Sequence, residues 1–179
     1  MQEASVFKIV TAGDGGVGKT TIIHRYVEGK FLENTSMTIG VEFSVKRLII
    51  GDREVTLQLW DFTGQEHLRF MLERYIYGSQ GALFMFDLNN ITRSLRNIEK
   101  WMEILYLGGQ IPILLVGTKL DLLENENNRK KFELFKHKID EIREEYNFVE
   151  YFQTSSKSGK YVDEAFLFLV NKILKTGVY

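Results

Sequence analysis

Runs of apolar residues that suit β-strands alternate along this chain with apolar residues at helical spacing. The runs predict six strands, over residues 6–12, 41–50, 55–61, 82–87, 111–117 and 148–154. Helical spacing predicts five helices, over residues 19–28, 68–77, 92–107, 129–146 and 161–175. Alternation of this kind is typical of an α/β fold, in which helices cover a largely parallel sheet.

The strand patterns also predict how the sheet is arranged. The fourth and fifth strands contain Ala-Leu-Phe-Met-Phe and Ile-Leu-Leu-Val, which are apolar throughout, as expected where helices cover both faces of a parallel sheet. Strands two and three alternate apolar and polar residues and are joined by Gly51-Asp52, a hairpin signal. We therefore expect a six-stranded, mostly parallel sheet with one antiparallel edge strand, flanked by five helices, and ligands at the carboxyl ends of its strands.

The composition is that of an ordinary globular protein and narrows the classes of function. At 179 residues with one proline, the chain is expected to form one domain over residues 1–179. Its net charge of −1 provides no positive field for nucleic acid or anionic lipid. No apolar run is long enough to span a membrane. The lack of cysteine excludes disulfides, thiolate metal sites and cysteine nucleophiles, and it suits a cytoplasmic protein.

The strongest chemical signal follows the first predicted strand and opens the first predicted helix. Residues 13–20 read Gly-Asp-Gly-Gly-Val-Gly-Lys-Thr, the pattern of a phosphate loop, and indicate a P-loop NTPase fold. Glycines let backbone N–H groups converge on phosphate, and the helix N-terminus adds others. Lys19 is expected to reach the β- and γ-phosphates, and the Thr20 hydroxyl to bind Mg²⁺. The predicted phosphate-binding residues are Gly15, Gly16, Val17, Gly18, Lys19, Thr20 and Thr21.

Residues before the second predicted strand and after the third are expected to complete a site around the γ-phosphate. The hydroxyl of Thr38 suits Mg²⁺, and Asp61 is placed to hold the same ion through water. Gly64 presents an N–H without a side chain in the way, and Gln65 is placed to orient an attacking water. The predicted metal ligands are Thr20, Thr38 and Asp61, and the predicted catalytic residues are Gln65, Lys19 and Gly64.

Segments after the fifth and sixth strands predict a guanine site. In Thr118-Lys119-Leu120-Asp121, the carboxylate suits the N1–H and 2-amino group of guanine, whereas adenine has neither donor on that edge. In Ser155-Ser156-Lys157, a backbone N–H suits guanine O6, and the lysine stem would flank the base. Each segment alone also reads as a turn, a loop cap or a solvent-facing stretch. Their order at successive strand ends, after a phosphate loop, favours the guanine-nucleotide interpretation. The predicted base-binding residues are Thr118, Lys119, Asp121, Ser155, Ser156 and Lys157.

With these motifs in place, almost the whole chain resembles the Ras-superfamily small GTPases, with most similarity to the Rab branch. The resemblance rests on the phosphate loop, on residues 26–31 and 38–43, and on Leu59-Trp60-Asp61. It implies that Phe31 stacks on guanine, that Thr38 marks switch I and that Gln65 is the catalytic glutamine of switch II. It further implies that effectors, exchange factors and GTPase-activating proteins bind the switch regions and an exposed aromatic triad, Phe43, Trp60 and Tyr75.

Several positions depart from the family pattern. Thr118 stands where most relatives have asparagine, although Rho-type relatives share Thr-Lys-Leu-Asp, and Gly15 replaces the usual serine of the Rab loop. Phe62-Thr63 and residues 71–77 also differ from Rab sequences, and residues 70–72 are similar to fungal septation-initiation GTPases. These last changes lie in switch II, where the resemblance places effector and exchange-factor contacts.

The C-terminus also departs from the family pattern. A Rab or Ras ends in a prenylated tail, but this sequence stops at Gly177-Val178-Tyr179 without a cysteine. We expect either that a tail is missing from this sequence or that the protein is an unanchored prokaryotic relative, such as an archaeal one. In either case these 179 residues are not expected to bind membranes.

The leading hypothesis is an Mg²⁺-dependent switch that binds GTP and GDP and hydrolyses GTP slowly, in regulation of the trafficking or signalling type. Hydrolysis is expected to be slow because no inserted domain delivers an arginine, and Arg69 and Arg74 are expected to face solvent or partners. One alternative is a non-cycling nucleotide-binding module of the same fold. Another is a P-loop ATPase or kinase, which Asp121 disfavours.

Overall fold

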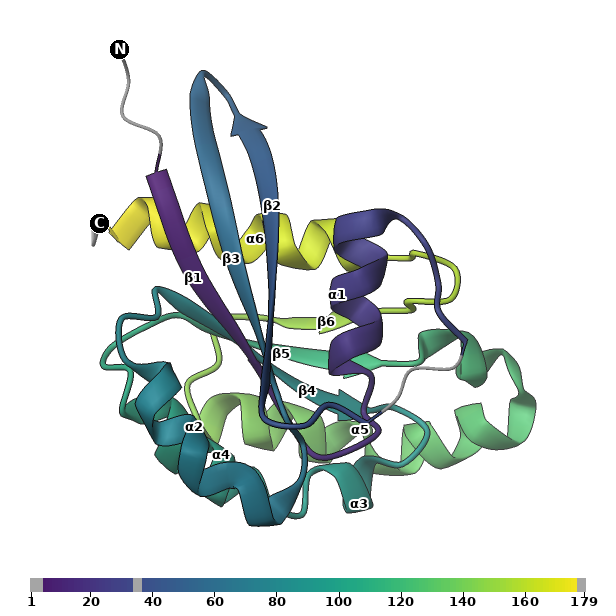
Figure 1. Ribbon diagram of the computed structural model, residues 1–179. Coiled ribbons are helices and arrows are strands. Elements are labelled where there is room, and N and C mark those ends of the chain that lie inside the picture. The colour runs from purple at the N-terminus through teal and green to yellow at the C-terminus, as the bar shows by residue number, and fades with distance from the viewer. Residues whose placement is uncertain (1–4, 34–36, 177–179) are drawn as a thin grey trace.

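A computed structural model of the chain describes residues 5–33 and 37–176. In this part of the chain, six strands form one sheet in the order β2-β3-β1-β4-β5-β6 (Figure 1). The strands are β1 (Ser5–Ala12), β2 (Val41–Ile50), β3 (Arg53–Phe62), β4 (Gly81–Asp87), β5 (Ile113–Thr118) and β6 (Tyr151–Gln153). Neighbouring strands are parallel except for β2 and β3, so the mostly parallel sheet with an antiparallel edge strand is confirmed.

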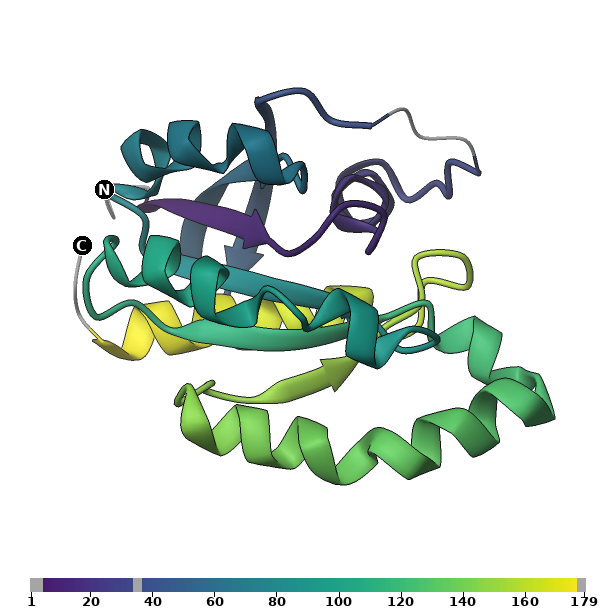
Figure 2. The same cartoon turned by 90° about the horizontal axis from the view of Figure 1, so that it is seen from below.

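Helices cover both faces of this sheet. They are α1 (Lys19–Glu28), α2 (Arg69–Ile76), α3 (Ile91–Ser94), α4 (Ile98–Tyr106), α5 (Glu126–Glu145) and α6 (Val162–Thr176), with short 3-10 helices η1 (Glu66–Leu68) and η2 (Leu120–Glu124). Apolar residues of α1 and α6 pack into one core cluster, and those of α2, α4 and α5 pack into another. The two clusters lie on opposite faces, as the two ribbon views show (Figures 1 and 2). Continuously apolar β4 and β5 are buried between them.

The helix count differs from the prediction in one place. The single helix expected over residues 92–107 is two helices, α3 and α4, separated by a turn. The Ser94 hydroxyl accepts from the Asp87 N–H at 3.0 Å and donates to the Asn90 carbonyl at 2.8 Å. Just before α4, the Asn97 side chain donates to Asp14. Side-chain bonds of this kind compete with helix continuation, so apolar spacing alone did not predict the break.

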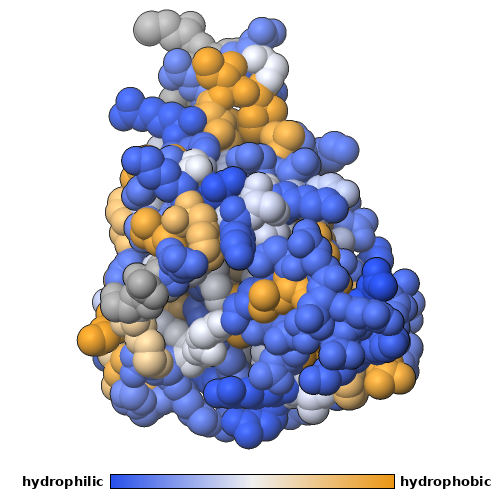
Figure 3. All heavy atoms as spheres, turned by 90° about the vertical axis from the view of Figure 1, so that its right-hand side faces the viewer, coloured by the Kyte–Doolittle hydropathy of each residue, from blue (hydrophilic) through white to orange (hydrophobic). Residues whose placement is uncertain are grey.

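The edge hairpin formed by β2 and β3 has a wetter face, as its alternating sequence predicted. Along β2, Phe43, Val45 and Ile49 are exposed, while the alternate residues are half-buried. In the space-filling view, hydrophobic atoms gather at the top, where this hairpin ends, and the surface below is mostly hydrophilic (Figure 3). Among the described residues, no helix is both long and apolar enough to cross a membrane. Residues 177–179, on which the C-terminal prediction rests, lie outside them.

Candidate functional site

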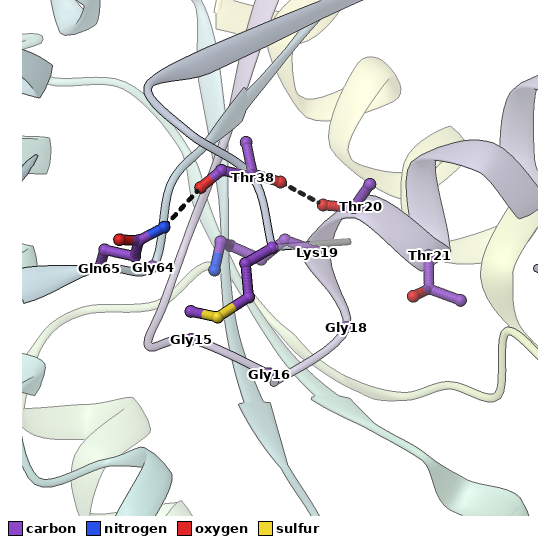
Figure 4. A pocket seen from close by; sticks show the side chains of 10 residues that line it. Gly15, Gly16, Gly18, Lys19, Thr20, Thr21, Thr38, Gly64 and Gln65 are labelled. Atoms are coloured by element: carbon purple, nitrogen blue, oxygen red, sulfur yellow. Dashed lines mark hydrogen bonds between the residues drawn. The ribbon is translucent and has the colours of Figure 1, made fainter. Parts of the chain in front are cut away.

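The loop of residues 13–18 connects β1 to α1 and folds around a small pocket of about 100 Å³. Gly13 has φ 136°, and a Cβ there would lie 2.3 Å from the Met85 carbonyl oxygen, so only glycine fits. Lys19, the first residue of α1, turns back over the loop and donates to the carbonyls of Gly13 at 2.8 Å and Asp14 at 3.0 Å. The pocket is lined by Gly15, Gly16, Gly18, Lys19, Thr20, Thr21, Met37, Thr38, Gly64 and Gln65 (Figure 4).

The Lys19 ammonium is the buried positive charge of this pocket. Burial lowers its pKa to about 8, against the opposing influence of the Asp61 and Asp14 carboxylates. Its two backbone acceptors carry no formal charge. An anion in the pocket would therefore gain a partly desolvated cation as its partner.

Three oxygen-bearing side chains converge beside Lys19. The hydroxyls of Thr20 and Thr38 lie 2.7 Å apart (Figure 4). Both donate to Oδ2 of Asp61, Thr38 at 3.2 Å and Thr20 at closer range, while Oδ1 of Asp61 accepts from Thr11 at 3.0 Å. The described residues contain no group of three or more His, Cys, Asp or Glu side chains that could hold a metal. The cluster instead offers hard oxygen donors and one carboxylate, a set that suits Mg²⁺ with phosphate and water oxygens completing its shell.

The segment that follows β3 forms the opposite wall of the pocket. Gly64 packs directly on the glycine-rich loop, since a Cβ there would lie 2.4 Å from the Gly15 nitrogen. The Gln65 amide donates to the Thr38 carbonyl at 3.1 Å, and the Thr63 hydroxyl donates to the same oxygen at 2.8 Å. Gln65 therefore lies at the pocket wall, between the segment of Thr38 and the loop of residues 13–18 (Figure 4).

A second pocket of about 380 Å³ adjoins the first and shares Gly16, Gly18 and Thr21 with it. The predicted base-binding side chains meet there, because its walls also include Phe31, Thr118, Lys119, Asp121, Ser156 and Lys157. Buried Ser155 stands behind this wall and donates to Oδ1 of Asp121 at 2.5 Å. The Ser155 N–H donates to the Lys160 carbonyl, whereas the Ser156 N–H has no protein acceptor among the described residues. The Lys157 N–H likewise has no protein acceptor there, so Ser156 and Lys157 are the residues of this segment with a free backbone donor.

Thr118 and Lys119 join this second pocket to the glycine-rich loop and to Asp87. The Thr118 hydroxyl donates to the Val17 carbonyl at 2.5 Å and lies 3.0 Å from the Phe86 carbonyl. The end of β5 is thereby joined to the loop of residues 13–18. Lys119 has φ 61° and forms an ion pair with Asp87 at 2.7 Å. The side chain that replaces the usual asparagine thus still bonds to the glycine-rich loop.

One buried group was predicted wrongly, and its partners were missed. Arg69, expected to face solvent or partners, is 7% exposed and forms an ion pair with Asp14 at 2.6 Å. Asp14 also accepts from Asn97 at 2.9 Å and from Trp101 Nε1 at 2.8 Å. An acidic side chain inside a glycine-rich loop was the available signal, because such a charge is stable there only with donors around it. Arg74 is exposed, as expected.

The aromatic triad joins the edge of the sheet to a helix, with Phe43 on β2, Trp60 on β3 and Tyr75 on α2. The Phe43 and Trp60 rings are 5.4 Å apart, and the Trp60 and Tyr75 rings are 5.9 Å apart. Phe43 is 52% exposed and Tyr75 36%, so the triad presents aromatic surface next to the segment that carries Gln65.

Comparison with known proteins identifies the family. The sequence model of the Ras family matches residues 8–175. The chain belongs to the Ras family. It is a Rab-like small GTPase, 31% identical over 176 residues to "Ras-related protein Rab-19" of Xenopus laevis and 34% over 171 residues to "Ras-related protein Rab-13" of Mesocricetus auratus. These alignments cover 97% and 94% of the chain, and 79% and 80% of the relatives.

A longer protein contains a similar region. The chain is 34% identical over 171 residues to "Ras and EF-hand domain-containing protein homolog" of Mus musculus, which covers 94% of the chain but only 27% of that protein. The chain thus spans about a quarter of that relative and about four fifths of the two Rab proteins.

Proposed function

We propose that this chain is one GTPase domain over residues 1–179 that binds GTP and GDP with Mg²⁺ across the two adjoining pockets. The single observation that carries the proposal is the continuity of the phosphate loop with a pocket that contains Asp121. Backbone N–H groups of the loop and the N-terminus of α1 would hold the phosphates together with Lys19. Asp121, fixed by Ser155, would accept from the guanine edge while Phe31 and the Lys119 and Lys157 stems flank the base.

GTP hydrolysis by this chain would depend on positioning and charge. Thr20, Thr38 and Asp61, whose oxygens converge, would hold Mg²⁺, and the ion would supply neutralisation of developing negative charge. Gln65, already at the pocket wall, would orient the attacking water, and the Gly64 N–H would hold the γ-phosphate. Loss of that phosphate releases these contacts, which is how the segments of Thr38 and Gly64 would act as switches I and II.

Two further features bear on how the switch would be used. The triad of Phe43, Trp60 and Tyr75 borders switch II and would bind effectors and regulators of the trafficking type. The alternative, a module that holds nucleotide without cycling, is disfavoured by the hydrogen bonds that bring Thr38, Asp61 and Gln65 together, where the γ-phosphate would lie in this proposal. Cycling requires those three groups, whereas permanent binding does not.

Removal of Mg²⁺ tests the proposed site directly. Chelation should accelerate GDP release on the order of 10- to 100-fold, because the ion joins phosphate oxygens to the protein. Thr20→Ala should release GDP nearly as fast in the presence of Mg²⁺ as the wild type does in its absence. Release of a fluorescent GDP analogue measures both rates. Thr92→Ala, which removes an exposed threonine of α3, is the control. Release that is insensitive to chelator would contradict the assignment of Thr20 and Thr38 to the metal.

The lowered pKa of Lys19 predicts that nucleotide binding takes up a proton. At pH 8 about half of Lys19 is neutral in the free protein, since its pKa is about 8. Bound phosphate favours the ammonium and raises the pKa again, so GDP binding should take up more protons at pH 8 than at pH 7. Affinity should accordingly fall as the pH rises above 8. Calorimetry in buffers of different ionisation enthalpy measures the uptake. Equal uptake at the two pH values would contradict this origin.

A further inference from the structure

The segment that carries Gln65 is short and lies between two contacts with the phosphate loop. On its N-terminal side, Gly64 packs against the Gly15 backbone so closely that no side chain fits between them. On its C-terminal side, Arg69 begins α2 directly after η1 (Glu66–Leu68). Between these two ends, the side-chain amide of Gln65 donates a hydrogen bond to the Thr38 carbonyl. The position of Gln65 therefore depends on how firmly both ends are held.

The C-terminal end is held by Asp14, the second residue of the same loop. Nη2 of Arg69 donates to Oδ1 of Asp14 at 2.6 Å, and the guanidinium stacks over the Trp101 ring, 4.8 Å from its centroid. The same carboxylate accepts from Trp101 Nε1 at 2.8 Å and from Asn97 at 2.9 Å. One side chain of the phosphate loop thus joins the start of α2 to the start of α4.

The ion pair between Arg69 and Asp14 is buried. The side chains of Arg69 and Asp14 are 8% and 16% exposed. Among the described residues, Nε and Nη1 of Arg69 have no acceptor, so the bond to Asp14 is the one hydrogen bond of this buried guanidinium. Removing either partner would leave the other charge buried without compensation. A second ion pair joins η1 to α4, between Glu66 and Lys100 at 2.9 Å, but both side chains are exposed and such pairs contribute little.

We propose that Asp14 is a positioning residue for GTP hydrolysis, which acts by docking Arg69 and thereby holding Gln65 against the γ-phosphate pocket. The proposal rests on the proposed function of that pocket. Asp14 itself does not touch the reacting atoms: its carboxylate is occupied by Arg69, Asn97 and Trp101. The docking also occupies Arg69, which is therefore not free to act on the phosphate as an arginine finger.

The test is single-turnover hydrolysis of pre-loaded GTP by Asp14→Asn and by Arg69→Met. Each variant should hydrolyse GTP roughly ten- to a hundredfold more slowly, because misplacement of a catalytic group by about 1 Å has effects of that size. The double variant should be no slower than either single one, since both break the same contact. In Asp14→Asn the side chain keeps its shape and one acceptor oxygen, which can accept from Trp101 or from Asn97 but not from both, because these bonds go to different oxygens of Asp14. Lys100→Ala, which breaks the exposed ion pair between η1 and α4, should hydrolyse GTP at the wild-type rate.

Gln65 distinguishes positioning from general destabilisation. In a Gln65→Leu background, Asp14→Asn should change the hydrolysis rate by less than about twofold, because the group that it positions is gone. Fluorescent GDP release and the unfolding temperature are measured on all variants. An Asp14→Asn rate equal to wild type, or an equally large Asp14 effect without Gln65, would overturn the positioning role. A wild-type chain that does not hydrolyse GTP at all would instead contradict the proposed function.

Discussion

Asp121→Asn should reverse the base preference of this GTPase. Asp121 lines the pocket that also contains Phe31 and Lys119, with Oδ1 held by Ser155, so its remaining capacity to accept would be available to the proposed guanine base. Two hydrogen bonds to a charged acceptor are worth about 1.5 to 3 kcal/mol each, so GTP affinity should fall by roughly 10² to 10⁴. Xanthosine triphosphate should bind better, because the new amide N–H meets the O2 of xanthine.

Competition against bound fluorescent GDP measures this preference with GTP, ATP and xanthosine triphosphate. For the wild type, ATP should fail to displace GDP at concentrations where GTP does so completely, because adenine leaves Asp121 without its donors. Asp52→Asn, which changes an exposed carboxylate in the β2–β3 turn, is the matched control and should leave the preference unchanged. Equal displacement by ATP and GTP would remove the basis for a guanine site.

Gln65→Leu should suppress GTP hydrolysis and leave GTP affinity nearly unchanged. The Gln65 amide bonds to the Thr38 carbonyl at the pocket wall, and the substitution removes water positioning but no predicted contact with the phosphates. Intrinsic hydrolysis should fall on the order of 10- to 100-fold. Single-turnover hydrolysis of pre-loaded GTP measures this. Hydrolysis at the wild-type rate would mean that another residue orients the water, and exposed His67 of η1 would be tested next.

The same variant should lose most of any stimulation by an activating partner. The wild-type chain should be slow by itself, because Arg69 is held by Asp14 and Arg74 is exposed on α2. An arginine supplied by a partner is worth roughly 10³ to 10⁵ in rate among Ras-type GTPases, the family of this chain, or about 4 to 7 kcal/mol of barrier. Fast hydrolysis by the isolated wild type would contradict this explanation.

Short motifs and strand patterns determined most of the fold and of the candidate site from the sequence. The phosphate loop needs glycine at Gly13 and a lysine at the start of the helix, and both requirements are local along the chain. The uninterrupted apolar runs of β4 and β5 reflect burial on both faces, and the Gly51-Asp52 turn sets the antiparallel edge. Because parallel strands end at one edge of a sheet, the order of the motifs was sufficient to predict that they meet.

The hydrogen-bond partners of the buried polar side chains could be identified only in the tertiary structure. Asp14, Arg69 and Trp101 are far apart in the sequence. Neither spacing nor composition therefore predicted that the Asp14 carboxylate accepts hydrogen bonds from both Arg69 and Trp101. The same contact explains why the helix expected over residues 92–107 breaks, since Asn97 donates to Asp14 as well. Likewise, the sequence placed Ser155 among the predicted base-binding residues but did not predict that its hydroxyl donates to Asp121. Periodicity records which face of an element is apolar, whereas the partner of a buried polar group is set by packing between distant elements.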